Sequence, residues 1–371
     1  MARGRRDGIV IAGGGLAGSL AALAMARMRP EIPLLIVEEN ERFGDSCFGS
    51  FADGDLDAEE LALIEPLLGP RWPGFYVAFP DLSRKLKADQ SGIAADAVHE
   101  AMIETLDPKQ YRLGTRIVAV REDALVLDGG ETIKAQGAID ARGPANLSIL
   151  DLLYETRLER DYLFEAPHRV DRPVLIDATV DQNGGLRFVQ CLPLAPDRLV
   201  VADVCLSERA QPDDQAAARI DHYVATRGWQ PKKVVTDCTS VRPLPTGGDF
   251  AAFWRLGGAR VAKLGLRGGF LHPVTGSAVA DAARNALILA RQEDFSGGAL
   301  HDLFEDNARL LWKKREFLRS ITGAIAAAGP EERRGVVERL CRLDPAMIGR
   351  LRADRLGMID RMRIQRALKE R

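Results

Sequence analysis

The stretch GIVIAGGGLAGSLAALAMARM, residues 8–28, constrains the fold of this chain more than any other segment. A short apolar run leads into Gly13, Gly15 and Gly18 at GxGxxG spacing, and good helix formers follow. A signal peptide would end at a small-residue cleavage site, whereas this run continues into a second apolar segment. A membrane span is disfavoured because glycines weaken the centre of a helix. The stretch therefore predicts a strand, a tight turn and a helix.

The second apolar segment, PLLIVE, completes the pattern of a dinucleotide-binding unit. It predicts a strand that ends at Glu38, twenty residues after Gly18, where a carboxylate accepts hydrogen bonds from ribose hydroxyls. The glycines allow the turn, the approach of a pyrophosphate and close packing of helix on strand, and the first helical amides attract phosphate. We expect cofactor contacts from the whole turn, namely Gly13, Gly14, Gly15, Leu16, Ala17 and Gly18.

Two later segments favour FAD over NAD as the dinucleotide. IKAQGAIDARGP predicts an apolar strand that runs into Asp140 and Gly143, which we expect beside the cofactor. VAKLGLRGGFLHPVTGSAVADAARNALILA predicts a strand, a glycine-rich loop and a long helix, whose first amides can stabilise negative charge on a reduced flavin. The cofactor residues expected from this segment are Gly265, Gly268, Gly269, Thr275 and Gly276.

Composition and charge exclude several other classes of protein. The net charge of −2 gives no reason to expect a nucleic-acid partner. The five cysteines are scattered without CxxC spacing, which argues against a disulfide framework or a zinc site and for a reducing compartment. The five histidines are dispersed as well, so we expect no metal.

The order of predicted elements indicates an α/β fold in which a β-rich domain interrupts a Rossmann-type unit. We expect a discontinuous FAD-binding domain over residues 1–70, 95–150 and 256–300. A substrate-binding sheet is expected over 71–94 and 151–255, because FYVAFP, PVLIDATV, LRFVQCLPL and DRLVVADVCL are apolar and β-rich.

Residues 301–371 are expected to form a C-terminal helical region. Its last 23 residues, GRLRADRLGMIDRMRIQRALKER, carry eight Lys or Arg against three Asp or Glu. This pattern fits either a solvated helix or a helix on a membrane surface.

Several segments resemble the bacterial lycopene β-cyclases, which belong to the wider superfamily of FAD hydroxylases and reductases. DATVDQNGGLRFVQCLPLAPDRLVVAD and GLRGGFLHPVTG are the most specific of these segments, and RGWQ, AFWR, REFLR and ADRLGMIDRMRI add to them. The resemblance extends almost end to end. It implies a carotenoid or polyprenyl substrate, reduced FAD with NADPH as an indirect reductant, and cyclisation without net redox change. It also implies a cytoplasmic protein, peripherally associated with the inner face of the cell membrane.

The chain departs from the family pattern at positions that matter for cyclisation. The position of the family's glutamate is Ala202, so that Asp203 and His272 are the remaining candidates for catalytic residues. Aromatic residues of the family are replaced as well, at Gly49, Leu186, Ser277, Leu340 and Cys341.

Three functions therefore stay open. The first is acid-initiated, non-redox cyclisation of a linear carotenoid or related end group, an intramolecular lyase or isomerase reaction. The second is a flavin-dependent oxidoreductase, either a reductase or a monooxygenase, that acts on an apolar substrate through the flavin itself. The third is a non-catalytic FAD- or carotenoid-binding protein. The oligomeric state is open too.

Overall fold

The amino-terminal strand lies in the middle of a parallel sheet, as the glycine-rich stretch predicts. We describe a computed structural model, which covers residues 7–44, 47, 49–94, 96–182, 184–210 and 214–369. The sheet has the strand order β18 (Ala262–Lys263), β12 (Gly137–Asp140), β1 (Ile9–Ala12), β2 (Leu34–Val37) and β8 (Tyr111–Arg112). All of these strands come from the three segments assigned to the FAD-binding domain, whose boundaries remain a prediction.

Helix α1 (Leu16–Met28) packs between this sheet and helix α6 (Val279–Ala290). Every residue from Gly18 to Met25 is buried, so the helix is apolar on all sides because all of its sides are covered. Its sequence looks like a membrane helix for the same reason. Among the described residues, no helix combines the length and hydropathy that a bilayer crossing needs.

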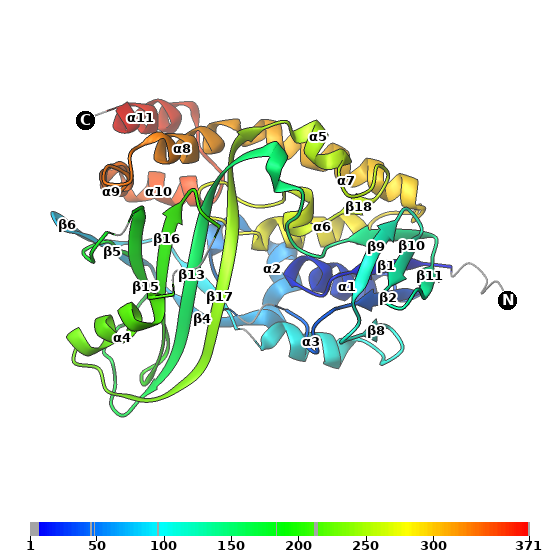
Figure 1. The fold of residues 1–371 in the computed structure, drawn as a ribbon, viewed down its shortest axis with the longest axis horizontal. Helices are drawn as coiled ribbons and strands as arrows, with labels where there is room; N and C mark the ends of the chain where they lie inside the picture. The colour runs from blue at the N-terminus through cyan, green and yellow to red at the C-terminus, as the bar shows by residue number, and fades with distance from the viewer. Residues whose placement is uncertain are drawn as a thin grey trace.

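A larger sheet of seven strands lies beside this unit along the long axis of the molecule (Figure 1). Its order is β17 (Pro231–Gly248), β13 (Leu150–Phe164), β16 (Arg198–Ser207), β15 (Leu186–Ala195), β14 (Val174–Asp177), β5 (Phe75–Phe79) and β6 (Leu82–Leu86). Two small sheets complete the strands: β11 (Thr132–Lys134), β10 (Ala124–Leu127) and β9 (Ile117–Arg121), and then β3 (Gly49–Ala52), β7 (Gln90–Ile93) and β4 (Leu68–Trp72).

The two faces of the seven-stranded sheet have different neighbours. Val200, Ala202 and Val204 of β16 belong to an apolar cluster with the C-terminal helices, whereas Leu199 and Val201 belong to a cluster with α4 (Ala216–Thr226). Alternate residues of a strand point to opposite faces, so each position on β16 is committed to one cluster.

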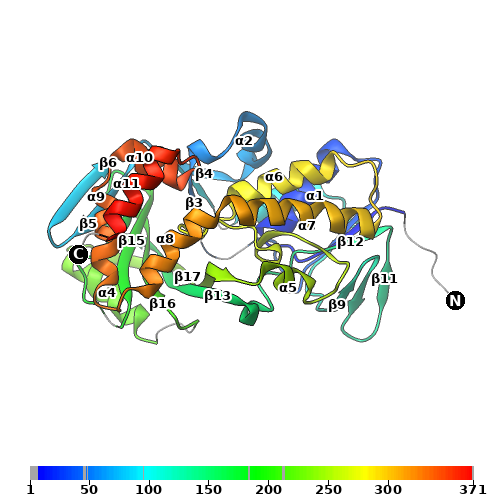
Figure 2. The same cartoon turned by 90° about the horizontal axis from the view of Figure 1, so that it is seen from above.

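Helices account for most of the remaining chain. The helical C-terminal region is present, and four of its helices gather over one face of the seven-stranded sheet (Figure 2). These are α8 (Glu316–Ala327), α9 (Arg333–Arg342), α10 (Pro345–Arg352) and α11 (Met358–Lys369). The other helices are α2 (Ala58–Ile64), α3 (Ala97–Thr105), α5 (Phe250–Arg255) and α7 (Gly297–Lys314).

The turn between β1 and α1 tolerates no side chain at Gly13. This residue has φ +99°, and a Cβ there would lie 2.7 Å from the carbonyl oxygen of Ala141. Gly129, in the turn after β10, has φ +88° but open space around it. We expect Gly129→Ala to lower the free energy of unfolding by about 1 kcal/mol, from backbone strain alone, and Gly13→Ala to lower it by about 2–4 kcal/mol. Urea denaturation measures both values, and equal losses would contradict the close contact.

Candidate active site

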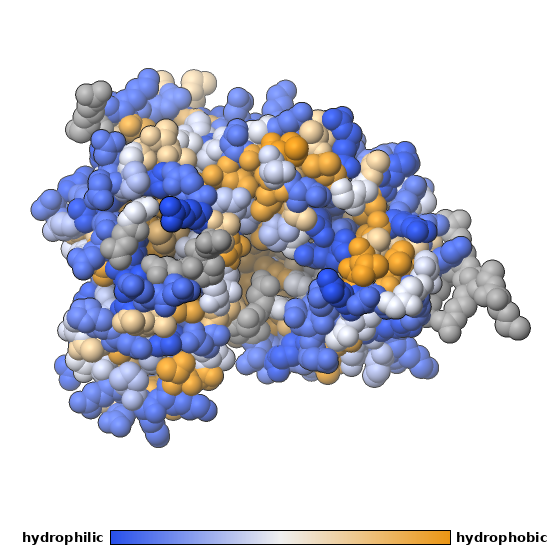
Figure 3. All heavy atoms as spheres, in the orientation of Figure 1, coloured by the Kyte–Doolittle hydropathy of each residue, from blue (hydrophilic) through white to orange (hydrophobic). Residues whose placement is uncertain are grey.

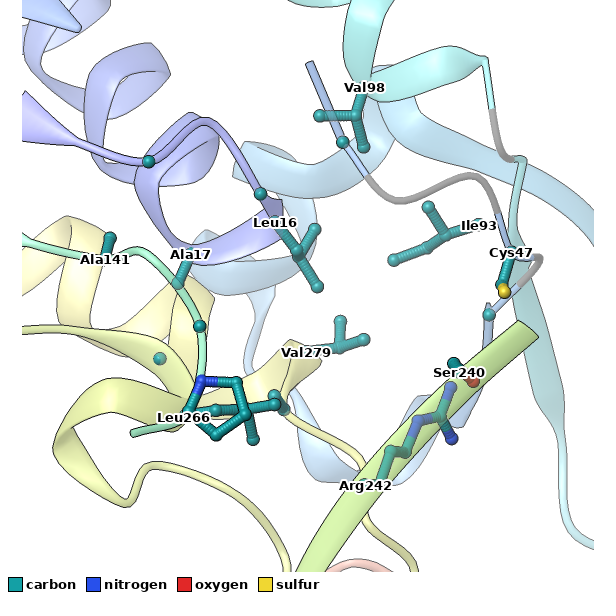
Figure 4. Close-up of a pocket in the computed structure, with 18 of the residues that line it drawn as sticks. Leu16, Ala17, Cys47, Ile93, Val98, Ala141, Ser240, Arg242, Leu266 and Val279 are labelled. Atoms are coloured by element: carbon teal, nitrogen blue, oxygen red, sulfur yellow. The ribbon is translucent and has the colours of Figure 1, made fainter. Parts of the chain in front are cut away.

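A cavity of about 490 Å³ extends from the glycine-rich turn to strand β17. Figure 3 shows a hollow in this face of the molecule, between the seven-stranded sheet and the amino-terminal unit. Leu16, Ala17 and Ala141 lie on one side of the cavity, and Ser240 and Arg242 lie on the other (Figure 4). The predicted cofactor residues that line this first cavity are Gly13, Gly15, Leu16, Ala17, Glu38, Gly143, Gly265 and Gly276.

The glycine-rich turn presents backbone amides to the first cavity. Helix α1 has Gly15 as its N-cap, and no described side chain caps it or places an acid in its first turn. The first amides of a helix have no partner within the helix, so an anion in the cavity can bind them. Glu38 follows β2 directly and is buried. It accepts hydrogen bonds from the amides of Gly14 (2.5 Å) and Asn40 (2.8 Å).

Six predicted cofactor residues lie outside the lining of the first cavity. Asp140 is buried in ion pairs with Arg142 (2.8 Å) and Arg267 (3.1 Å). Burial raises the pKa of this carboxyl, but the two arginines outweigh it, and the pKa lies below its usual value. Gly14 lies in the turn before α1, and Gly18 lies in the first turns of α1 itself. Gly268 ends the short 3-10 helix Gly265–Gly268, and Gly269 follows it. Thr275 lines the second cavity.

A second cavity, of about 200 Å³, adjoins the first. Ser50, Arg242 and Ser277 line both of them. The second cavity lies between the seven-stranded sheet and helices α8, α9 and α10. Its apolar lining includes Phe51, Phe75, Leu86, Leu175, Leu186, Phe188, Val204, Leu206, Val274, Ile325, Val337, Leu340, Ile348 and Leu351.

Two carboxyl groups line the second cavity, and the sequence singles out neither of them. Asp55 is the last residue of the short 3-10 helix Asp53–Asp55. It is buried, whereas most of its neighbours in this acid-rich run are more exposed. Burial raises the pKa of Asp55, and the nearby Arg284 only partly opposes this. Glu155 on β13 pairs with Arg242 at 3.2 Å. Asp55 is therefore the acid most easily kept protonated beside the apolar wall.

Asp203, the acid expected from the sequence, lies on the other face of the sheet. It is buried between Arg187 and Arg219, each at 2.5 Å, and Arg219 belongs to α4. It lines neither cavity. Its neighbours on β16, Ala202 and Val204, face the helices instead. This placement does not support the expected role of Asp203 as a proton donor.

His272 holds the loop between the two cavities but lines neither of them. Its Nδ1 accepts hydrogen bonds from the amides of Val274 and Thr275, both at 3.2 Å, which leaves the proton on Nε2 to be donated to the carbonyl of Leu351 (2.9 Å). Burial, assisted by the charge of Arg315, lowers the pKa of His272 to about 4. The ring thus positions the backbone of Thr275, and this placement does not support the expected catalytic role of His272.

Comparison with known proteins identifies the family. The sequence pattern of the family described as "Lycopene cyclase protein" matches residues 8–369. This chain belongs to the lycopene cyclase family. It is 30% identical to the lycopene beta-cyclase of Pantoea ananas over 96% of this chain and 93% of that one, and 31% identical to that of Pseudescherichia vulneris over 96% and 92%.

Solved structures with the same fold include flavin-dependent enzymes. One is a geranylgeranyl bacteriochlorophyll reductase-like protein from Thermoplasma acidophilum, with 13% identity and a TM-score of 0.62 over 99% of this chain and 97% of that one. Another is a flavin-dependent halogenase from Xanthomonas campestris, with 15% identity and a TM-score of 0.63 over 99% and 95%. At this identity the likeness shows the shared fold.

The positions at which this lycopene cyclase family member departs from the expected pattern gather around the two cavities. Gly49 lines the first cavity, and Ala202 is fully buried in the apolar cluster that faces the C-terminal helices. The second cavity is lined by Leu186, Ser277, Leu340 and Cys341. Apart from Ala202, the departures therefore change the lining of two adjoining cavities.

One prediction from cysteine spacing is wrong. Cys47 and Cys238 form a disulfide, although 191 positions separate them. Spacing rules detect pairs that are close in sequence, whereas the fold brings the segment after β2 against β17. Both cysteines line the first cavity. Ligand atoms of Cys47, Cys238 and the buried Glu159 lie within 4.8 Å of one another, as in a partial metal site.

The buried His272 makes a pH-dependent contribution to stability. Its pKa is lower in the folded chain than in the unfolded chain, so the unfolded chain binds more protons as the pH falls. The contribution is therefore complete above about pH 6.5, the unfolded value, and is lost by about pH 4. We expect wild type to have a higher free energy of unfolding than His272→Asn at pH 7. This difference, the stability gap, should narrow by about 3 kcal/mol between pH 7 and pH 4.

Urea denaturation at several pH values measures this gap. His222→Asn, on the exposed side of α4, is the matched control for loss of a histidine. A His272 gap that stays constant across the range would contradict the buried neutral ring.

Proposed function

We propose that the protein is a lycopene cyclase-like flavoprotein, which binds FAD in the first cavity and cyclises a linear carotenoid or related polyprenyl end group in the second. One observation carries the proposal: Asp55, an acid whose burial raises its pKa, lines an apolar cavity that shares its walls with the first cavity. Family membership supports the same chemistry.

The first cavity has the donor set that FAD requires. Its 490 Å³ volume is in the range of cofactor sites. The amides of Gly15, Leu16 and Ala17 would hold the diphosphate, and the Glu38 carboxylate the ribose of the adenosine. Gly276 and Ser277 lie where the first cavity meets the second. Bound there in its reduced form, with NADPH as the indirect electron source, FAD would supply negative charge that stabilises a cationic substrate.

The residues of the second cavity supply the rest of the cyclisation chemistry. The Asp55 carboxyl gives a proton to a terminal double bond, a nearby double bond attacks the resulting cation, and a ring forms. Phe51, Phe75 and Phe188 offer aromatic faces that stabilise the cation, and the aliphatic wall excludes water. Since the product has the atoms of the substrate, a carboxylate of the same cavity must take a proton back, and Asp55 and Glu155 are the two that line it.

The size of the second cavity limits what enters it. At about 200 Å³ it is smaller than sites that enclose whole drug-sized ligands, which measure roughly 300–1,000 Å³. One end group of a long polyene fits, and the remainder of the chain must extend outside. This limit favours a reaction at a chain end.

Removal of the Asp55 acid tests the proposed chemistry. With reduced FAD and lycopene in liposomes, we expect Asp55→Asn to lower the cyclisation rate by about 10²–10⁴-fold while FAD affinity is unchanged, because only proton transfer is lost. The wild-type rate should fall as the pH rises through the raised pKa of Asp55. Cyclic products are measured by chromatography.

Asp53→Asn is the matched control. Asp53 lies in the same 3-10 helix but pairs with Arg71 at 2.7 Å and lines neither cavity. Equal loss of activity in both variants, or full activity in Asp55→Asn, would remove Asp55 from the reaction.

A specific observation also supports the oxidoreductase alternative. Arg352 lines the second cavity over the ring of Phe75, at 5.2 Å, and none of the described groups bonds its Nε. Burial lowers its pKa to about 10, so it remains charged, and a fixed cation disfavours a carbocation nearby. Anaerobic incubation of the reduced flavoprotein with substrate separates the two functions. Cyclic product without flavin reoxidation supports cyclisation, and reoxidation coupled to turnover supports hydride transfer.

We also propose that helix α11 contacts the membrane from which the substrate enters. Met358, Ile359 and Met362 are 78%, 62% and 56% exposed, and exposed Arg361 and Arg363 lie among them. An apolar patch with basic neighbours fits an anionic bilayer surface. The helix packs on α9, which lines the second cavity.

Vesicle sedimentation tests this contact. We expect the triple variant Met358→Ser, Ile359→Ser and Met362→Ser to bind phosphatidylglycerol vesicles about tenfold or more weakly than wild type, since each side chain loses apolar burial. Leu310→Ser on α7, a residue 69% exposed, is the control and should bind like wild type. Equal binding by all three proteins would place the contact elsewhere.

A further inference from the structure

The Cys47–Cys238 disulfide connects two walls of the first cavity. Cys238 lies on β17 directly opposite Glu159 of β13, which in turn lies opposite Ala202 of β16. Cys47 comes from the segment between β2 and β3, and its Cα lies 5.5 Å from that of Cys238. Cys238 is buried and Cys47 is half-buried, so Cys47 is the more exposed residue of the pair.

The pair lies at the end of the first cavity that meets the second. Figure 4 shows Cys47 beside Ser240 and Arg242, on the far side of the cavity from Leu16 and Ala17. Arg242 lines both cavities, whereas the glycine-rich turn and Glu38 line only the first. With its diphosphate held at the glycine-rich turn, a flavin that fills the first cavity would have its ring system toward the cysteines.

We propose that Cys47 and Cys238 are a redox-active pair that exchanges two electrons with the flavin, with Glu159 as the group that takes up a proton. The inference rests on the proposed binding of FAD. It supplies the step that the proposed function leaves open, the source of electrons for a reduced flavin.

The step balances in atoms and electrons. In the reduced pair, the two thiols lose two protons and two electrons as the S–S bond forms. The oxidised flavin takes both electrons and one proton, and the Glu159 carboxylate takes the other proton. An external dithiol then attacks Cys47, breaks the S–S bond and becomes a disulfide itself, which restores the two thiols. An NADPH-dependent dithiol protein would make NADPH the indirect reductant.

Glu159 is placed for this role by two neighbours. Its carboxylate pairs with Arg157 at 2.9 Å, and Arg157 also donates to Gln190 at 2.6 Å. The two contacts hold the carboxylate in place on the face of the sheet that carries Cys238. Its oxygen lies within 4.8 Å of both sulfurs.

The location argues for a reactive pair over a structural one. The other three cysteines, Cys191, Cys205 and Cys341, are thiols outside this disulfide. The sole disulfide of the described residues lies on the wall of a cavity instead of within an apolar cluster. A disulfide that lines a cavity, with one of its cysteines only half-buried, can be reached by external thiols from that side.

The first experiment counts electrons. Wild type and Cys47→Ser, Cys238→Ser and Cys205→Ser variants are loaded with FAD, and FAD affinity is measured by fluorescence quenching. Each is then titrated anaerobically with dithionite. We expect wild type and Cys205→Ser to consume two electron pairs per flavin, and the other two variants one pair. The number of thiols titrated in denatured wild type should rise from three before reduction to five after reduction.

The second experiment follows the exchange itself. Under anaerobic conditions, dithiothreitol should bleach the flavin of wild type and of Cys205→Ser. Bleaching should be at least about 100-fold slower in Cys47→Ser and Cys238→Ser. Glu159→Gln keeps a hydrogen-bond partner for Arg157. It should bind FAD normally but exchange about tenfold or more slowly, with an altered pH profile, because the proton acceptor is lost.

The outcomes separate this inference from the proposed function. If no variant binds FAD, the proposed function and this inference fail together. If all variants bind FAD but consume one electron pair and bleach alike, the inference alone fails and the disulfide is only a structural crosslink. A last test adds zinc to the reduced protein. Retention of one zinc ion per chain, with no bleaching by dithiothreitol, would assign these residues to a metal site and overturn the redox pair.

Discussion

The antiparallel register of β13 with β16 and β17 decides which side chains reach the two cavities. The register aligns Cys238, Glu159 and Ala202 in one row across the three strands, and Ser240, Arg157 and Val204 in the next row on the same face. A shift of one residue would turn each row to the opposite face. Such a shift would turn Asp203 toward the C-terminal helices and would turn Arg157 and Glu159 away from them. The chemistry of the site therefore depends on backbone pairing more than on any single residue.

The amino-terminal unit could be predicted from sequence because its signals are local. Gly13, Gly18 and Glu38 lie within one strand–helix–strand unit, and their spacing is set by that unit alone. Asp203 shows where this reasoning stops. Every residue from Leu199 to Val204 is buried, so the strand has no alternation from which its faces could be assigned. The Cys47–Cys238 pair was equally hidden, since only the folded sheet brings it together.

Two kinds of change from the expected family pattern occur on this side of the sheet, one in the walls of the second cavity and the other at Ala202 in the apolar cluster beside it. Leucines and a serine replace expected aromatic residues, which removes aromatic faces from around a cation. The acid missing at Ala202 has a neighbour in Glu159, directly opposite on β13, but that carboxylate is ion-paired with Arg157. Arg157 thus engages the carboxylate that lies directly beside Ala202. In the proposed cyclisation the proton would come instead from Asp55, which lines the second cavity.

The ion pairs around Arg284 explain why this arginine only partly opposes the effect of burial on Asp55. Arg284 lies 3.3 Å from Asp55 but also 2.9 Å from Glu60 and 3.7 Å from Asp281. Its charge is therefore divided among three acids of the described chain. A second arginine, Arg315, pairs directly with Asp281 at 2.5 Å and with Asp354 at 3.0 Å. Desolvation therefore outweighs the attraction of Arg284, and the pKa of Asp55 is raised where the carboxyl lines the second cavity.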